Sequence, residues 1–137
     1  MRVALPAQLA SLSIEDAHGR VWRQALGGLA DRVTLDPVKE RPLSSAGAEP
    51  DVWLTDGHAG GLNVDEPLVA VVHEVGWTTS PLRRFLDPGF ARSVAAGTAA
   101  GVHASAQVLT PSEWSRRQVI DAFGVDGERV HAVPYGV

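Results

Sequence analysis

Residues 67–73 read PLVAVVH, and this short run decides the fold class. Every residue from Leu68 to Val72 is apolar, whereas a strand with one face in water would alternate between apolar and polar side chains. Continuous runs of Val, Leu and Ala are typical of parallel strands that helices cover on both faces. The run therefore predicts a buried parallel strand that ends at His73.

The segments that follow this strand carry alternating helix and strand signals. Asp87 as an N-cap and Pro88 at the first helical position predict a helix that runs towards Gly101. The apolar run at Gln107–Thr110 predicts the next strand.

A second helix is predicted directly after that strand. Thr110 as the cap, Pro111 in the first turn and Glu113 three residues after the cap form a strong helix start. The helix should run to Phe123 and stop at Gly124.

The rest of the chain continues the same alternation. An apolar stripe at three- and four-residue spacing from Ile14 to Leu29 predicts a helix that ends near two glycines. Short apolar runs predict the other strands at Met1–Leu5, Arg32–Leu35, Asp51–Thr55 and Arg129–Pro134. We therefore expect an α/β fold, a Rossmann-like open parallel sheet with helices on both faces and right-handed crossovers.

The composition excludes several classes of protein. The chain has 137 residues, enough for one domain, and its 45% hydrophobic and 20% charged residues are typical of a soluble globular protein. A net charge of −4 argues against sequence-independent binding to nucleic acid. The absence of cysteine excludes a disulfide scaffold and a thiolate metal site, and makes the cytoplasm the expected compartment. No transmembrane segment is predicted, because no window approaches the roughly 20 apolar residues that cross a bilayer.

Several catalytic motifs are missing from the sequence. It contains no GxxxxGK[ST] phosphate loop, no GxGxxG after the first strand and no GxSxG nucleophile elbow. His73 and Glu74 begin like an HExxH zinc motif, but Trp77 occupies the place of the second histidine. We expect neither a metal site nor a bound cofactor.

Polar residues do collect where the predicted strands end. In an open parallel sheet, ligands bind outside the carboxyl ends of the strands. The segments at that edge include His18, Gly19, Asp56, His58, His73, Glu74, Trp77 and Ser112. The sequence therefore predicts a binding site at this edge.

Each of these residues also has a purely structural interpretation. The His73 imidazole can donate to a ligand, or a neighbouring carbonyl can satisfy it. Trp77 can stack on a ligand or simply pack, and Asp56 can cap its own glycine-rich turn. Arg116 and Arg117 can form a solvated helix face, or one of them can point towards a phosphate.

Four stretches of the sequence resemble a known family. VLTPSEWSRRQVIDAFGVDGERVHAVPYGV (108–137) resembles the end of the N-terminal domain in family 4 glycosyltransferases of the GT-B fold. PLVAVVHEVGW (67–77) and DVWLTDGHAGG (51–61) are similar to two strands of that domain with the turns that follow them. HGRVWRQALGGLADRVTL (18–35) is similar to its first helix and second strand. These stretches are distributed over nearly the whole chain, from residue 18 to residue 137.

The resemblance implies roles for the residues at the carboxyl edge. His73 would be the catalytic residue that contacts the donor sugar near the reacting carbon, and His18, Gly19 and Ser112 would bind the donor's phosphates and sugar. His18 replaces the first glycine of the family's usual pair, so backbone approach to phosphate is less assured there. The acceptor would face Asp56, His58, Glu74 and Trp77.

The resemblance also implies a domain organisation. Residues 1–133 would be the acceptor-side domain, residues 134–137 would begin a linker, and the nucleotide-binding domain of the same enzyme would follow Val137. The intact protein would be a retaining enzyme that moves a sugar from a nucleoside-diphosphate sugar to a sugar or a sugar-containing acceptor. The donor is a substrate, so no cofactor is needed.

A second hypothesis comes from a different class. The chain could be a free-standing Rossmann-like module that binds a partner or a small ligand without catalysis. Coding sequence beyond Val137 for a second α/β domain would favour the transferase, and a stop codon there would favour the module. In the isolated chain, the exposed edge near Trp77 and residues 76–81 is expected to self-associate weakly.

Overall fold

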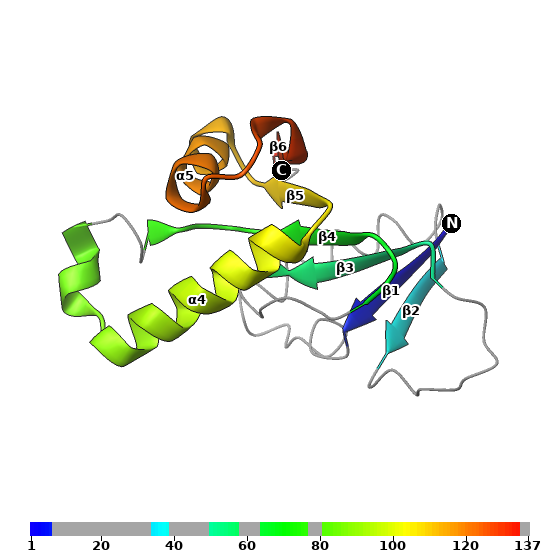
Figure 1. Ribbon diagram of the computed structural model, residues 1–137, viewed down its shortest axis with the longest axis horizontal. Coiled ribbons are helices and arrows are strands. Elements are labelled where there is room, and N and C mark those ends of the chain that lie inside the picture. The colour runs from blue at the N-terminus through cyan, green and yellow to red at the C-terminus, as the bar shows by residue number, and fades with distance from the viewer. Residues whose placement is uncertain (7–33, 39–49, 58–63, 77–80, 135–137) are drawn as a thin grey trace. The chain divides into compact units, whose positions relative to one another are not determined.

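The computed structural model describes residues 1–6, 34–38, 50–57, 64–76 and 81–134. The chain divides into two compact units, Met1–Thr55 and Asp56–Val137 (Figure 1). Both units are built on parallel strands. The predicted helix between Ile14 and Leu29 lies outside the described residues.

The first unit contains three strands. They are β1 (Arg2–Pro6), β2 (Thr34–Val38) and β3 (Val52–Asp56). β1 lies between the other two and is parallel to both, with Val3 opposite Val52 on β3. The backbone N–H of Arg2 donates to the Asp51 carboxylate over 2.6 Å, which fixes the start of this pairing.

The second strand lies further along the chain than the sequence suggested. We predicted it at Arg32–Leu35, and the structure places it at Thr34–Val38, so that Pro37 is inside the strand. Proline has no N–H to donate to a neighbouring strand and is tolerated at the edge of a sheet. β2 is the outer strand of this unit, which explains why a proline that appeared to end the strand is accommodated within it.

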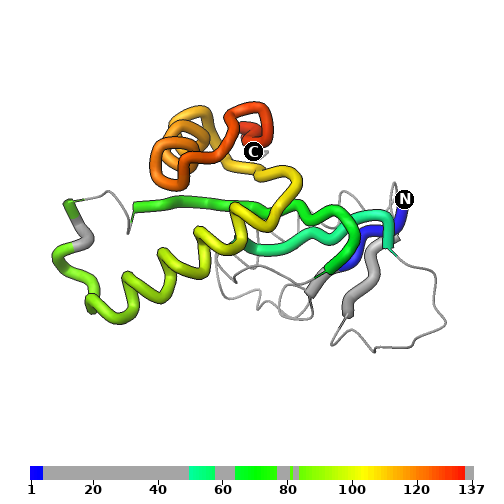
Figure 2. Tube along the Cα trace, viewed as in Figure 1, coloured from blue at the N-terminus to red at the C-terminus, as the bar shows by residue number. Residues whose placement is uncertain are grey.

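The second unit consists of two successive strand–helix–strand passes (Figures 1 and 2). Its elements are β4 (Leu68–Val71), η2 (Pro81–Phe85), α4 (Pro88–Ala104), β5 (Gln107–Thr110), α5 (Glu113–Phe123), η3 (Gly127–Arg129) and β6 (Val130–Ala132). β5 lies between β4 and β6 and is parallel to both. The α/β class with a parallel sheet is therefore confirmed.

Helix α4 begins as the sequence predicts and ends later. The Asp87 carboxylate accepts the backbone N–H of Phe90 over 2.8 Å, which confirms Asp87 as the N-cap. The helix continues beyond Gly101 to Ala104, and Ser105 caps its end. Gly101 therefore has a role other than helix termination.

Helix α5 shows the reverse pattern, with a later start and the predicted end. The N-cap is Ser112 rather than Thr110, because the Ser112 hydroxyl accepts the N–H of Ser115 over 3.1 Å. Gly124 ends the helix with a φ of 63°, a left-handed conformation that favours glycine. The hydroxyl on either side of Pro111 could have capped this helix, and the sequence pattern favoured the wrong one.

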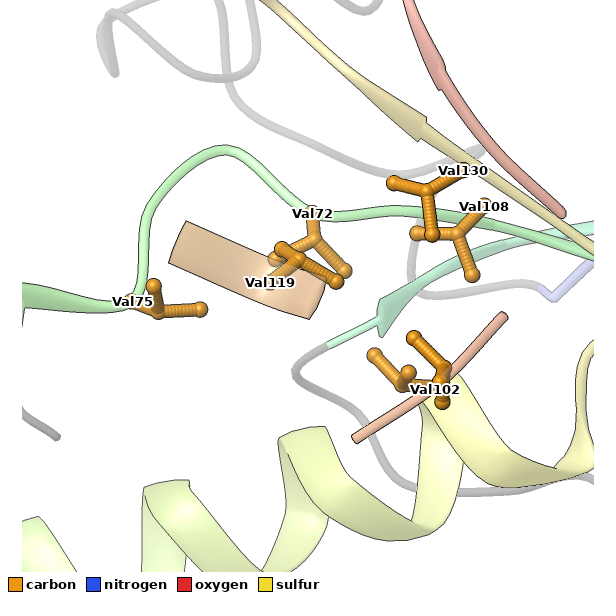
Figure 3. Packing of buried hydrophobic residues seen from close by; sticks show 7 residues of the cluster. Val72, Val75, Val102, Val108, Val119 and Val130 are labelled. Carbon is orange, nitrogen blue, oxygen red and sulfur yellow. The ribbon is translucent and has the colours of Figure 1, made fainter. Parts of the chain in front are cut away.

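Valine side chains fill the core of the second unit. By strand register Ala70, Val108 and Val130 share one face of the sheet, and all three are buried. Val102 of α4 and Val119 of α5 belong to the same buried cluster (Figure 3). Both described helices thus contribute to the core on this face.

The opposite face of these strands is only half-buried. Val69 and Val71 of β4 and Leu109 of β5 are intermediate in exposure, although the sequence suggested a strand covered on both sides. The two crossovers move in the same direction across the sheet, from β4 to β5 and from β5 to β6. Crossovers of one hand that move in one direction place their helices on one face.

Two arginine side chains hold the ends of these elements together. Arg116 of α5 donates to the carbonyl oxygens of Val130 and Gly127, each over 2.6 Å. Arg129 donates to carbonyl oxygens at the end of α4, those of Val102 and Ser105. The planar guanidinium presents its N–H donors in a fixed fork, which suits it to bonding two carbonyls at once.

The core predicts a clear contrast between two valines. Val119→Ala should lower the free energy of unfolding by about 2 kcal/mol, because it removes two buried methyl groups and leaves a cavity. Val133→Ala is the matched control, since Val133 is 50% exposed. Urea unfolding followed by circular dichroism measures both, and equal losses would contradict this description of the core.

Candidate functional site

The carboxyl ends of three strands meet at one edge of the second unit. The β4–β5 ladder continues past β4, because the N–H of Val72 donates to the carbonyl of Leu109 over 2.8 Å. On the other side of β5, the N–H of Val133 donates to the carbonyl of Thr110 over 2.7 Å. His73 therefore directly follows Val72, which extends the β4–β5 pairing by one residue beyond β4.

His73 and Glu74 are held between two buried valines. Val72 and Val75 are 0% and 1% exposed and belong to the same core cluster. Figure 3 shows the chain bending out from the core after Val72 and returning at Val75. Because the residues on both sides of the His73–Glu74 dipeptide are packed in the core, the dipeptide backbone has little freedom to move.

The two side chains of this dipeptide differ in exposure. His73 is half-buried and its Nε2 atom is shielded from solvent, whereas Glu74 is exposed. Burial alternates from Leu68 to His73, so His73 continues the side of the strand that faces away from the valine core. The structure thus offers a partly buried imidazole beside an exposed carboxylate at the carboxyl edge.

The turn after β3 lies against the end of β4. Gly57 is buried, and a Cβ atom at this position would lie 2.5 Å from Cγ2 of Val72 and 3.2 Å from the carbonyl oxygen of Val71. Asp56 and His73 each directly adjoin this contact in sequence. The structure therefore places the sequence neighbours of Asp56 and His73, Gly57 and Val72, in direct contact, and a shared site for the two side chains stays a prediction.

Helix α4 packs against the same turn. A Cβ atom at Gly101 would lie 2.5 Å from the carbonyl oxygen of Gly57 and 3.2 Å from its carbonyl carbon. Glycine at position 101 is required for this close approach, which explains why the helix runs through it. The sequence predicted a helix end near Gly101 and gave no sign of its contact with Gly57.

Ser112 lies where the sequence placed it, and its hydroxyl makes structural contacts. Its Oγ accepts the N–H of Ser115 and lies 3.1 Å from Oγ of Ser115. These bonds fix the first turn of α5 beside the end of β5. A role for Ser112 in donor binding stays a prediction.

Arg116 is half-buried and has a structural role that differs from the predicted solvated helix face. Its guanidinium donates to two backbone carbonyls and lies 3.7 Å from the Glu113 carboxylate. Its donors are engaged in holding α5 to β6. Arg117 is exposed on the surface of α5, as a solvated helix face requires.

The remaining predicted site residues lie outside the described part of the chain. They are His18, Gly19, His58 and Trp77. Their places in the site stay predictions. Val75, which is buried in the core two residues after His73, was not singled out from the sequence.

No protein-family model matches the sequence, and no curated protein matches it either.

Within the part of the chain that the structure describes, no group of three or more His, Asp or Glu side chains is placed to hold a metal ion. No helix within those ranges has the length and apolar character needed to cross a membrane.

The close approach at this edge can be tested by adding one methyl group. Gly101→Ala should destabilise the protein by about 1–3 kcal/mol through overpacking against the Gly57 backbone, although alanine favours a helix by up to about 1 kcal/mol. Thermal unfolding gives the sign. Ala100→Gly, at the exposed neighbouring position, calibrates the helix propensity. A stabilised Gly101→Ala variant would show that the contact is not tight.

Proposed function

We propose that this chain is the acceptor-side half of a retaining glycosyltransferase that uses a nucleoside-diphosphate sugar. The fold class is the one that the resemblance to family 4 glycosyltransferases implies. The observation that carries the proposal is the position of His73, a half-buried imidazole directly after Val72, whose N–H extends the β4–β5 pairing. The resemblance assigns donor-sugar contact to this position.

The proposal gives each residue at the edge a task. The reaction breaks the bond between the sugar's anomeric carbon and the phosphate, and forms a bond from that carbon to an acceptor oxygen, whose proton is lost. His73 would orient the donor sugar so that its anomeric carbon faces the acceptor. Asp56 and Glu74 would accept hydrogen bonds from acceptor hydroxyls. Fixed donors and cations of a second domain would stabilise the leaving phosphate.

The rigidity of the edge supports this assignment. A group that orients a substrate must itself be held, because small errors in placement cost large factors in rate. Val72 and Val75 fix the backbone on both sides of His73, and Gly57 packs directly on Val72. A residue on a freely moving loop would be a poorer candidate for this task.

The alternative is a binding module without catalysis. The exposed aromatic side chains of Phe85 and Phe90, which are 72% and 59% exposed, favour a surface that contacts a partner. Continuation of the coding sequence past Val137 into a second α/β domain separates the two proposals, because only the transferase needs one.

The 137-residue chain alone is expected to fold without transferring sugar. It should also bind nucleotide sugars with a dissociation constant of about 1 mM or weaker, because only the sugar and phosphate would find partners. Calorimetric titration and a transfer assay with common nucleotide sugars test both statements. Turnover by this chain, or micromolar affinity for a nucleotide sugar, would contradict the proposal that a second domain binds the nucleotide.

The function of His73 is tested in the longest protein that the reading frame encodes. His73→Ala should lower kcat/KM roughly a hundredfold, which corresponds to about 2.7 kcal/mol. The stability cost should stay near about 1 kcal/mol, because a half-buried ring outside the valine core contributes modestly to folding. Steady-state kinetics and thermal unfolding measure the two effects.

His103→Ala is the matched control for this substitution. His103 is exposed in the last turn of α4, far along the chain from the end of β4. Its loss should change neither turnover nor stability appreciably. Near-normal turnover of His73→Ala together with a large drop in Tm would instead assign His73 to the fold.

A further inference from the structure

Exposed apolar side chains are concentrated in one short segment. Six large hydrophobic residues are exposed in the described part of the chain, and three of them are Phe85, Leu86 and Phe90, at 72%, 37% and 59%. They lie on η2, on the bend after it and on the first turn of α4. We call residues 81–92, PLRRFLDPGFAR, the arginine–phenylalanine surface.

This surface is basic in a chain that is acidic overall. Its described side chains include Arg84 and Arg92 against one acid, Asp87, whereas the whole chain has a net charge of −4. The Asp87 carboxylate is engaged at the helix N-terminus, where it accepts the N–H of Phe90. The Arg84 guanidinium lies 4.8 Å from the centre of the Phe85 ring, so cation and aromatic ring share one exposed site.

The start of α4 projects away from the rest of its unit. In Figure 1 this end of the helix lies apart from β5, α5 and β6. Ala91 is buried, and the next buried residue along the helix is Thr98. The arginine–phenylalanine surface belongs to the crossover from β4 to β5. That crossover begins at the carboxyl end of β4, so the surface follows His73 along the chain.

We propose that the arginine–phenylalanine surface docks on an anionic lipid membrane. Phe85, Leu86 and Phe90 would enter the boundary between headgroups and acyl chains, and the arginines would meet lipid phosphates. The exposed aromatic rings match the apolar part of this boundary, and the local positive charge matches the anionic headgroups. The docking does not depend on the proposed transferase activity.

A second copy of the chain fits the surface less well. A symmetric dimer across this surface would place the arginines of one copy beside those of the other, and like charges in contact oppose association. An acidic protein would match the charge, and binding to such a partner is an outcome that the test distinguishes.

Vesicle flotation with the full 137-residue chain tests the proposal. One set of vesicles is pure phosphatidylcholine, and the other contains about one phosphatidylglycerol in three lipids. We expect binding to the anionic vesicles and at least roughly tenfold weaker binding to the neutral ones, with weaker binding at high salt. No binding to anionic vesicles, or equal binding to both, would overturn the proposal.

Matched pairs of variants locate the surface. Phe85→Ser with Phe90→Ser should weaken binding roughly tenfold or more, whereas Trp114→Ser, at an aromatic ring 57% exposed outside the surface, should not. Arg84→Glu should weaken binding roughly tenfold, whereas Arg117→Glu, which makes the same charge change on exposed α5, should not.

Two further results would overturn the proposal. One is an equal loss of vesicle binding within either pair of variants. The other concerns Phe85→Ser with Phe90→Ser. The proposal fails if these substitutions abolish self-association in lipid-free ultracentrifugation, or binding to soluble polyglutamate, but leave vesicle binding unchanged. Thermal unfolding of each variant confirms that the fold is intact, because the substituted side chains are exposed.

Discussion

The small size of its core side chains constrains the second unit more than any other feature. The largest fully buried side chains in the described residues are valines, followed by threonines and a serine. A core of such residues is closely packed only if the backbones that enclose it approach one another. Gly101 permits α4 to reach the Gly57 carbonyl, and Gly57 in turn lies against Val72. Helix, turn and strand end are thus joined by contacts that leave no room for a Cβ atom.

The candidate site follows from this constraint. The same contacts that close the valine core also fix the residues next to Asp56 and His73. Two arginines then hold α5 and the end of α4 through backbone carbonyls, and Arg116 also lies beside the Glu113 carboxylate.

Local sequence signals predicted the helices and strands of the second unit well. They did not predict contacts between residues that are far apart in the sequence. Strand β5, the Asp87 cap and the end of α5 at Gly124 depend on a few adjacent residues, and all were predicted. The role of Gly101 depends on a segment over forty residues earlier, which no local pattern reveals. The placement of His73 at a strand end was predicted, but its support by Val75 was not, because a lone valine after a strand carries no signal of where it packs.

The order of the strands has a consequence for how the protein forms during synthesis. In the second unit each strand pairs with the next one along the chain, β4 with β5 and β5 with β6. In the first unit β1 is central and has its second neighbour only when β3 has been made. Pairings between distant segments form slowly because a long loop must close first. β1 therefore pairs with β2 first and gains its second neighbour only after residues 52–56 have been made, whereas in the second unit each strand can pair with the strand made just before it.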